Sequence, residues 1–206
     1  MQVFPGGKGL NQSVALAKAG MEVYHAGCIG TDGEMLTDVL ESNGVDISNI
    51  KKVDEKTGHA IIQVSNKGDN SIFLYSGSNA KITEEFVDEV LDKFQKGDML
   101  LLQNEINKID YIIEKAYKKG MCIIFNPSPY NDEIKNLDFN MLSYIIIQNL
   151  KSLLLSEVKE VYIVIPKKSF FSRHLRLMPL IQLPREIHLQ DTFLHKQQWG
   201  TLLKNP

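Results

Sequence analysis

The sequence predicts an α/β fold in which a mostly parallel sheet has helices on both faces and carries a small β lid. Short apolar segments alternate with segments of helical periodicity, the pattern of parallel strands joined by crossover helices. Residues 99–102 are apolar throughout, as expected for a strand buried on both faces. From Gly58 the pattern changes to period two, which predicts an antiparallel lid hairpin over about residues 58–76 that turns at residues 66–70.

The first elements are delimited by glycines. Residues 5–9 contain three glycines and a proline, which predicts a loop. Helix-forming residues follow, and Gly20 is placed to cap the helix that they form, as Gly44 is for the next one. In this part we expect helices at residues 11–19 and 34–43 and strands at residues 22–29, 59–64 and 71–75.

The later elements continue the alternation of helix and strand. Thr83 is a candidate N-cap because two acidic residues follow it in the first turn, and Gly120 is a candidate C-cap. Ligands of such sheets bind at the carboxyl ends of the strands, so Asn104, Glu105 and Asn126 are expected to face that crevice. In this part we expect helices at residues 83–94 and 108–119 and strands at residues 99–102, 122–125, 144–147 and 161–165.

The composition is that of an ordinary soluble chain. Of the 206 residues, 43% are hydrophobic and 23% are charged, and the formal net charge is -2. This balance gives no reason to expect nucleic acid or an anionic membrane as a partner. There is no apolar run of about 18 residues, no signal-peptide pattern, and no metal or redox motif around Cys28 and Cys122. We therefore expect a cytoplasmic protein whose two thiols are buried.

The segment GGKGLNQ at residues 6–12 is the most informative motif. Glycines let the backbone approach a ligand closely, while Lys8 and Asn11 supply hydrogen-bond donors and an acceptor. The segment precedes a predicted helix, whose free N–H groups favour hydroxyls or anions. Taken alone, a simple turn explains these residues equally well. The spacing of a Walker A loop is absent.

Residues 5–20 resemble the sugar-binding signature of the ribokinase (PfkB-type) carbohydrate kinases. The resemblance continues in register over about residues 2–147, and these ordered landmarks favour the ribokinase type within the family. The further matching segments are GCIGTDG at residues 27–33, GVD at 44–46, NSI at 70–72 with GSNA at 77–80, LLQNE at 101–105 and NPSP at 126–129.

The resemblance implies a ribokinase-like fold and a site for a small-molecule sugar. Gly7, Lys8 and Asn11 would bind the sugar hydroxyls, and Glu105 would do so from the opposite wall. The alternatives are that Lys8 is a solvated loop lysine, Glu105 a surface carboxylate and Asn126 merely the start of a turn. The resemblance further implies ATP and Mg²⁺ as cofactors, with K⁺ as a further cation to consider, and a homodimer formed through the lid strands.

The residues that transfer the phosphoryl group in this family are not found. The family uses a G-A-G-D helix start as anion hole and catalytic base; we assign no catalytic residue and no metal ligand, and we interpret Asp191 as a decoy because Leu-Gln precedes it. Asn149 matches the asparagine of the family's N-x-x-E motif and is the candidate nucleotide-binding residue, but Ser152 stands where the glutamate belongs. The family's opening strand is also missing. We therefore expect a fold that is incomplete at both ends.

The genetic code offers an account of the last residues. One permitted set of codons for residues 179–193, read from its third base, encodes VDTTAAGDTFTGYF, in which A-A-G-D corresponds to the family's missing G-A-G-D motif. Fourteen consecutive codons make coincidence a poor explanation. We therefore expect residues 1–147 to form a partial ribokinase-like domain and residues 148–206 to be a degraded or out-of-frame segment.

Three functions remain open from the sequence. The first is an ATP-dependent kinase that converts D-ribose to D-ribose 5-phosphate, although this chain, without the anion-hole motif, is expected to be inactive. The second is another PfkB-type sugar or nucleoside kinase. The third is a non-catalytic remnant that still binds sugar, which ribose binding without turnover would distinguish from the first.

Overall fold

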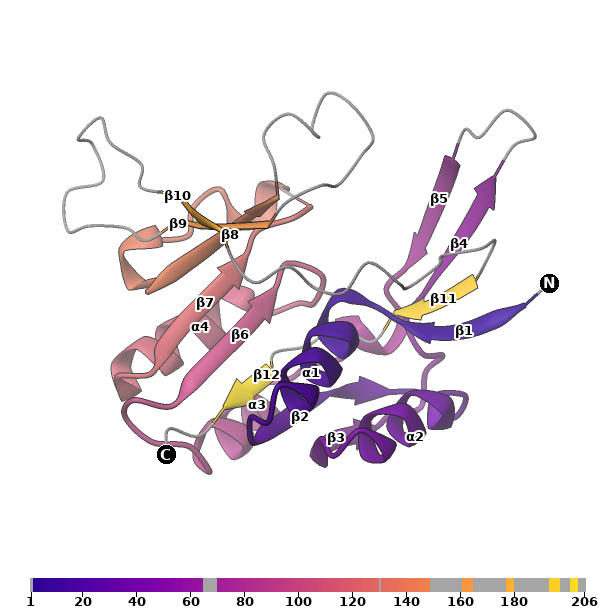
Figure 1. Cartoon of the computed structure of the whole chain (residues 1–206), viewed down its shortest axis with the longest axis horizontal. Helices are drawn as coiled ribbons and strands as arrows, with labels where there is room; N and C mark the ends of the chain where they lie inside the picture. Colours follow the sequence, from indigo (N-terminus) through magenta and orange to yellow (C-terminus); the bar gives the residue numbers. More distant parts are fainter. Residues whose placement is uncertain are drawn as a thin grey trace.

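The structure is a computed structural model that describes residues 2–64, 70–129, 131–148, 161–164, 177–179, 193–196 and 201–203. These residues form two sheets and four helices, with short 3-10 turns between them (Figure 1). The helices are α1 (Lys8–Lys18), α2 (Glu34–Ser42), α3 (Glu84–Leu91) and α4 (Ile109–Lys119), and the 3-10 turns are η1 (Gly77–Ala80), η2 (Asp132–Ile134) and η3 (Phe139–Met141).

The main sheet is the larger of the two. Among the described residues it has eight strands, in the order β10 (Leu177–Pro179), β9 (Val161–Val164), β8 (Tyr144–Gln148), β7 (Cys122–Asn126), β6 (Met99–Gln103), β12 (Thr201–Leu203), β2 (Val23–Ile29) and β3 (Asp46–Lys52). The pairs β2–β3, β6–β7 and β7–β8 are parallel, as predicted. The described antiparallel pairs of this sheet all include a strand that follows residue 148. The predicted α/β fold is therefore confirmed, with its parallel part in the first 148 residues.

The lid sheet stands away from the main sheet (Figure 1). Its described strands are, in order, β1 (Val3–Gly6), β11 (Phe193–Lys196), β4 (His59–Val64) and β5 (Asn70–Tyr75). The predicted hairpin is β4 and β5, paired antiparallel from His59 with Tyr75 to Val64 with Asn70. The lid is larger than the predicted hairpin because β11 pairs with β4 and β1 pairs with β11.

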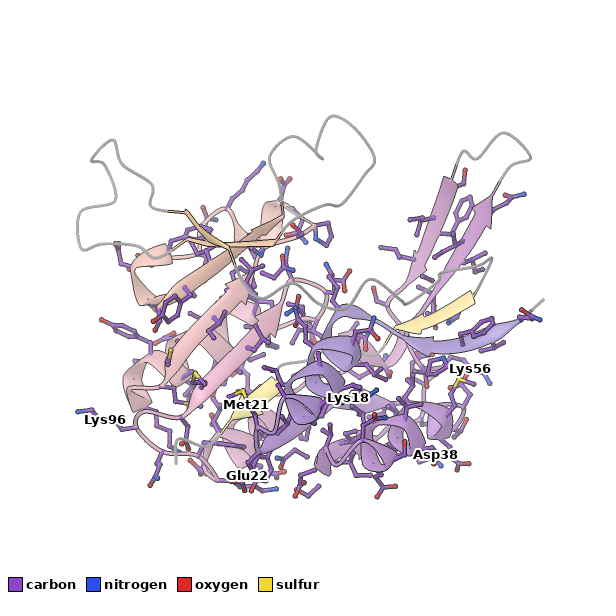
Figure 2. All side chains as sticks on the ribbon, in the orientation of Figure 1. Lys18, Met21, Glu22, Asp38, Lys56 and Lys96 are labelled. Atoms are coloured by element: carbon purple, nitrogen blue, oxygen red, sulfur yellow. The ribbon has the colours of Figure 1, made fainter. Side chains whose placement is uncertain are left out.

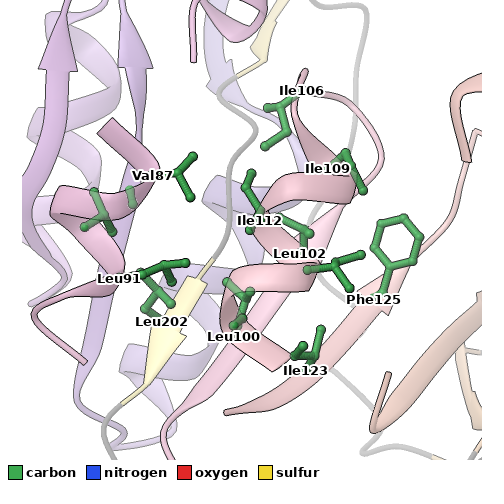
Figure 3. Close-up of a cluster of buried hydrophobic side chains, with 14 of the residues drawn as sticks. Val87, Leu91, Leu100, Leu102, Ile106, Ile109, Ile112, Ile123, Phe125 and Leu202 are labelled. Carbon is green, nitrogen blue, oxygen red and sulfur yellow. The ribbon is translucent and has the colours of Figure 1, made fainter. Parts of the chain in front are cut away.

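Helices cover both faces of the main sheet and create two apolar cores. Because side chains alternate along a strand, even-numbered residues of β2 and β6 pack with α3 and α4, and odd-numbered residues lie toward α1 and α2. Figure 3 shows the larger core, in which Leu100 and Leu102 of β6 and Ile123 of β7 lie against α4. Leu202 of β12 enters the same core and is 1% exposed. The middle of the sheet is therefore packed on both sides.

Many charged side chains lie on the outside of the molecule, whereas Asp98 is buried. Lys18, Asp38 and Lys96 are exposed and project from the surface in Figure 2. The described helices are all too short or too polar to form a membrane span. Cys28 is buried, as predicted, and this burial raises the pKa of its thiol to about 11 against the opposing effect of Lys51. The prediction for Cys122 was wrong, since it is only half-buried.

The N-terminal segment also differs from the prediction. Helix α1 begins at Lys8, not at residue 11, and β1 occupies part of the predicted loop. Gly7 explains the early helix start, because it has φ 114° and ψ 150° and places a sharp change of direction directly before Lys8. The first N–H groups of α1 therefore lie within the glycine-rich segment itself.

Candidate functional site

The candidate site lies where the carboxyl ends of β6 and β7 meet the N-terminus of α1. The parallel register places Gln103 opposite Asn126, so the residues that follow both strands emerge at the same edge of the sheet. The pairing continues past the strands, because the Asn104 backbone N–H donates to the Asn126 carbonyl at 3.1 Å. Asn104, Glu105 and Asn126 therefore lie together, as the order of strands and helices predicted.

Lys8 and Glu105 form an ion pair at this edge. The Lys8 Nζ lies 3.2 Å from the Glu105 Oε1, and their side chains are 29% and 9% exposed. The Lys8 ammonium also donates a hydrogen bond to the Ser128 carbonyl oxygen. A carboxylate this deeply shielded depends on its cationic partner, because removing one member leaves a partly desolvated charge. The sequence singled out both residues, but it did not predict that they touch.

Gly7 and Asn11 take different places around this pair. The left-handed φ of Gly7 disfavours any residue with a Cβ, and its carbonyl accepts the Asn11 backbone N–H at 3.0 Å in the first turn of α1. Gly7 is buried next to Lys8, whereas Asn11 is exposed. No side-chain hydrogen bond joins Asn11 to another described residue. Of the four predicted sugar contacts, the structure thus joins Lys8 with Glu105 directly and leaves Asn11 apart.

A buried amide pair was missed by the sequence reasoning. Gln103, the last residue of β6, is 0% exposed and points toward α1, where its Nε2 donates to the Gln12 Oε1 at 2.5 Å. Among the described residues, the Gln103 Oε1 has no hydrogen-bond partner. The sequence signal for this pair is that each of the two site motifs contains a glutamine, and that alternation along β6 places odd-numbered residues such as Gln103 toward α1.

A cavity of about 260 Å³ lies between the lid and the main sheet. Glu105 lines this cavity, together with Asn104 and Asn131 of the main domain and with His59, Leu74 and Tyr75 of the lid. The volume is slightly below the about 300–1,000 Å³ that is usual for drug-sized ligands. A cavity of this size with one carboxylate in its wall suits a small polar molecule.

Two aromatic rings form the lid side of the cavity. His59 and Tyr75 are cross-strand partners at the base of the hairpin, with ring centroids 5.0 Å apart. The Tyr75 hydroxyl donates to the Glu55 Oε1 at 2.9 Å, and this bond raises the pKa of the Tyr75 phenol. Glu55 also lies 3.6 Å from the Lys81 Nζ. The lid wall is thus tied by side chains to the main domain.

Several other polar residues have structural places. The Asn126 Oδ1 accepts the Ser128 backbone N–H at 3.0 Å, the geometry of an Asx turn, which agrees with the alternative that Asn126 starts a turn. His25 is buried, and its Nδ1 lies 2.7 Å from the Ser13 Oγ. Burial lowers the pKa of His25 to about 4, so the ring is neutral at pH 7.

The remaining predicted residues fall outside the structural description. Asn149, the candidate nucleotide-binding residue, and Asp191, the suspected decoy, both lie outside the described residues. In the part of the chain that the structure describes, no three His, Cys, Asp or Glu side chains are grouped so that they could hold a metal ion. The described part therefore assigns no residue to Mg²⁺ or to ATP.

Comparison with known proteins places this geometry in a family. Residues 1–151 match the model of the pfkB family of carbohydrate kinases. The ribokinase of Haemophilus influenzae is 35% identical over 144 residues, which make up 66% of this chain and 47% of that protein. The ribokinase of Schizosaccharomyces pombe is 35% identical over 149 residues, which make up 68% of this chain and 45% of that protein.

The similarity extends to a solved structure. The ribokinase of Cryptococcus neoformans in complex with ADP matches with a TM-score of 0.65 at 26% identity, and the match covers 86% of this chain and 68% of that one. The chain spans about half the length of the curated relatives it matches. Because the family model covers well over half of the chain, the chain belongs to the pfkB family of carbohydrate kinases.

Proposed function

We propose that this member of the family carries the sugar-binding part of an ATP-dependent kinase that converts D-ribose to D-ribose 5-phosphate. The observation that carries the proposal is the contact of Lys8 with Glu105 beside a cavity of about 260 Å³. The similarity to two ribokinases supports ribose as the sugar.

The proposed binding mode uses the complementary hydrogen-bonding groups of the ion pair. A sugar hydroxyl both donates and accepts, and an ammonium beside a carboxylate offers one partner for each role. Glu105 faces the cavity, and Lys8 stands at the N-terminus of α1, where the helix dipole adds a partial positive charge. Asn11, in the first turn of the same helix, is proposed to hydrogen-bond a sugar hydroxyl as well.

We further propose that this chain binds ribose without phosphorylating it. Phosphoryl transfer needs a positioned base and an anion hole, and the in-frame sequence contains no G-A-G-D motif that would supply them. ATP would bring the phosphoryl group, but the described residues include no assigned nucleotide contact. The residues described here would bind and orient the sugar.

Titration calorimetry of the full chain with D-ribose tests the binding proposal. We expect saturable binding that Lys8→Ala and Glu105→Gln each weaken about tenfold or more, because each change leaves one partly desolvated partner of the pair. Lys18→Ala is the matched control, since Lys18 is an exposed lysine on the same helix (Figure 2). Unchanged affinity in both site variants, or no binding by the wild type, would contradict the proposal.

A coupled ADP-release assay with ribose and ATP tests the absence of turnover. We expect no ribose-dependent ADP above the buffer control. Measurable phosphorylation would show that the base and anion hole exist in residues outside the described part. Preferential binding of a fructose derivative or a nucleoside would instead favour another PfkB-type kinase.

We propose that residues 148–206 are a degraded or out-of-frame segment, and that the frameshift lies before residue 179. The support is the VDTTAAGDTFTGYF reading of the codons for residues 179–193. Sequencing the messenger RNA decides this directly. If the shifted frame does not encode V-D-T-T-A-A-G-D-T-F, the explanation is wrong.

The lid is proposed to carry a homodimer interface, as the family resemblance implies. In the described lid sheet β5 is an edge strand, and its residues Ile72, Phe73 and Leu74 are 57%, 62% and 57% exposed. A contiguous exposed apolar strand of this kind favours pairing with another chain. Sedimentation velocity should show a concentration-dependent dimer that Phe73→Ser weakens, and a strictly monomeric wild type would contradict the interface.

A further inference from the structure

Asn104 occupies a buried position between the ion pair and a neighbouring turn. It follows β6 directly, precedes Glu105, and is 3% exposed. An amide that is buried this deeply requires hydrogen-bond partners. Among the described residues its Oδ1 has none, so its Nδ2 makes the contacts that hold the side chain. The partners that it has indicate what the residue does.

Among the described residues, the Asn104 amide donates to the turn that follows β7. Its Nδ2 lies 2.5 Å from the Pro129 carbonyl oxygen, 3.3 Å from the Asn131 Oδ1 and 3.4 Å from the Pro127 carbonyl oxygen. All three partners are acceptors, and the amide group has two hydrogens to share among them. The site thus requires a donor, and aspartate, which has the same shape but is ionised at neutral pH, would place a carboxylate against three oxygens.

The same turn orients Lys8. The Ser128 carbonyl, between two of the Asn104 acceptors, receives a hydrogen bond from the Lys8 ammonium. The Ser128 backbone N–H is held in turn by the Asn126 Oδ1. The turn is therefore fixed by Asn126 on its N–H side and by Asn104 on its carbonyl side, and it presents one carbonyl to the site lysine.

We propose that Asn104 is a positioning residue that holds the turn that follows β7 so that the Ser128 carbonyl aims the Lys8 ammonium at Glu105. Asn104 acts on Lys8 through the turn. Adjacent residues thus have different roles: Glu105 provides the charge that pairs with Lys8, and Asn104 sets the position of Lys8. The sugar-binding arm of the test below rests on the proposed function, whereas the lysine-labelling arm does not.

The decisive variant is Asn104→Asp, which keeps the side-chain volume and removes the donor. Brief labelling of the full chain with acetic anhydride, followed by peptide mass spectrometry, measures how available each lysine is. We expect Lys8 to be labelled several-fold faster in the variant than in the wild type, while the exposed Lys18 is labelled at the same rate. Circular dichroism checks that both proteins are folded.

Asn107→Asp is the matched control. Asn107 lines the same cavity, and its amide likewise bonds to backbone, with the Nδ2 2.8 Å from the Ile82 carbonyl oxygen and the Oδ1 3.2 Å from the Ile82 nitrogen. The control therefore imposes the same chemical change at a residue that has no hydrogen bond to the turn that follows β7 in the described structure. We expect it to leave the labelling of Lys8 unchanged. Equal increases in both variants, or no increase in Asn104→Asp, would overturn the assignment.

A milder variant covers the case in which Asn104→Asp does not fold. Asn131→Ala removes one of the three acceptors from a half-buried position of the turn and should raise Lys8 labelling by a smaller factor. Wild-type labelling in this variant would then overturn the proposal. In calorimetry, Asn104→Asp should weaken ribose binding about tenfold. If the wild type binds no ribose, the proposed function fails, but the labelling result still decides the role of Asn104.

Discussion

The main sheet and the lid sheet place similar side chains in opposite surroundings. Leu102 and Ile123 of the main sheet are 0% exposed, whereas Ile72 and Phe73 of the lid are more than half exposed. Both sets of strands are rich in aliphatic and aromatic residues, so strand propensity does not separate them. The two sheets differ in how they are covered, because helices pack on the main sheet and no described helix packs on the exposed face of β5. The main sheet is therefore stabilised by the helices that cover it, whereas the stability of the lid depends on the surfaces that its exposed face contacts.

The largest expected effect comes from one substitution made in both sheets. Ile123→Ala should lower the free energy of unfolding by about 2–5 kcal/mol, because it leaves a cavity in a packed core. Ile72→Ala should lower it by less than about 0.5 kcal/mol, as is usual for surface changes. Urea unfolding at low protein concentration measures both. Similar costs would remove the distinction, and a cost for Ile72→Ala that grows with protein concentration would show that its face is covered in a dimer.

A buried histidine makes the stability of the main sheet depend on pH. The pKa of His25 is about 4 in the folded state and about 6.5 in the unfolded chain, so between these values the unfolded state binds more protons. Stability contributed by the neutral ring is complete above pH 6.5 and falls as the pH drops toward 4, by about 3 kcal/mol in all.

The variant His25→Gln isolates this contribution. Unfolding free energies measured at pH 7 and pH 4.5 should differ less in the variant than in the wild type. Both proteins share the same carboxylates, so the difference between the two slopes belongs to His25. Identical slopes would mean that the ring is protonated in the folded state or exposed to water.

A smaller effect is expected for the strand that completes the main sheet. Leu202 is buried in the same core as Leu102, but its strand β12 has only three residues. Leu202→Ala should lower the unfolding free energy by about 2 kcal/mol, at the low end for a buried leucine, because so short a strand can detach locally. Hydrogen exchange of β2 amides should rise in this variant. A smaller loss of unfolding free energy than that of Ile72→Ala would show that β12 is not part of the core.

The smallest effect concerns a helix that covers the main sheet. The Thr83 Oγ1 accepts the Phe86 backbone N–H at 3.2 Å and caps α3, as the sequence predicted. Thr83→Ala should lower stability by about 1 kcal/mol. Thr37→Ala in the interior of α2 is the control and should be neutral or slightly stabilising, because alanine favours helix interiors. Equal effects of the two changes on the thermal midpoint would contradict the cap.

The sequence predicted what depends on local pattern. The apolar runs of β6 and β7, the lid hairpin and the cap at Thr83 all follow from periodicity or from one residue type at one position. The start of α1 was missed because Lys8 and Gly9 lie in a glycine-rich segment, and a single left-handed glycine before them suffices to begin the helix.

The local sequence pattern could not predict contacts between residues that are far apart in the chain. Lys8 and Glu105 were each identified as site residues, but their ion pair depends on how α1 crosses the end of β6. Asn104 was expected to face the crevice, but its hydrogen-bond partners depend on the direction of carbonyl groups in the turn that follows β7. Strands β1 and β11 belong to the lid because β11 pairs with β4 and β1 pairs with β11. Neither strand has an alternating hydrophobic pattern that would predict this position.

The position of β12 also bears on the order of events during synthesis. In the described structure, residues 201–203 lie between β2 and β6, so the facing edges of these two earlier strands have no hydrogen-bonded partner until residues 201–203 have been made. Closing such long-range pairs is slow, since the entropy of ordering the intervening chain precedes the gain from contacts. Until then the edges of β2 and β6 remain open to other strands. On the ribosome, the first 150 residues would therefore be the natural clients of a chaperone.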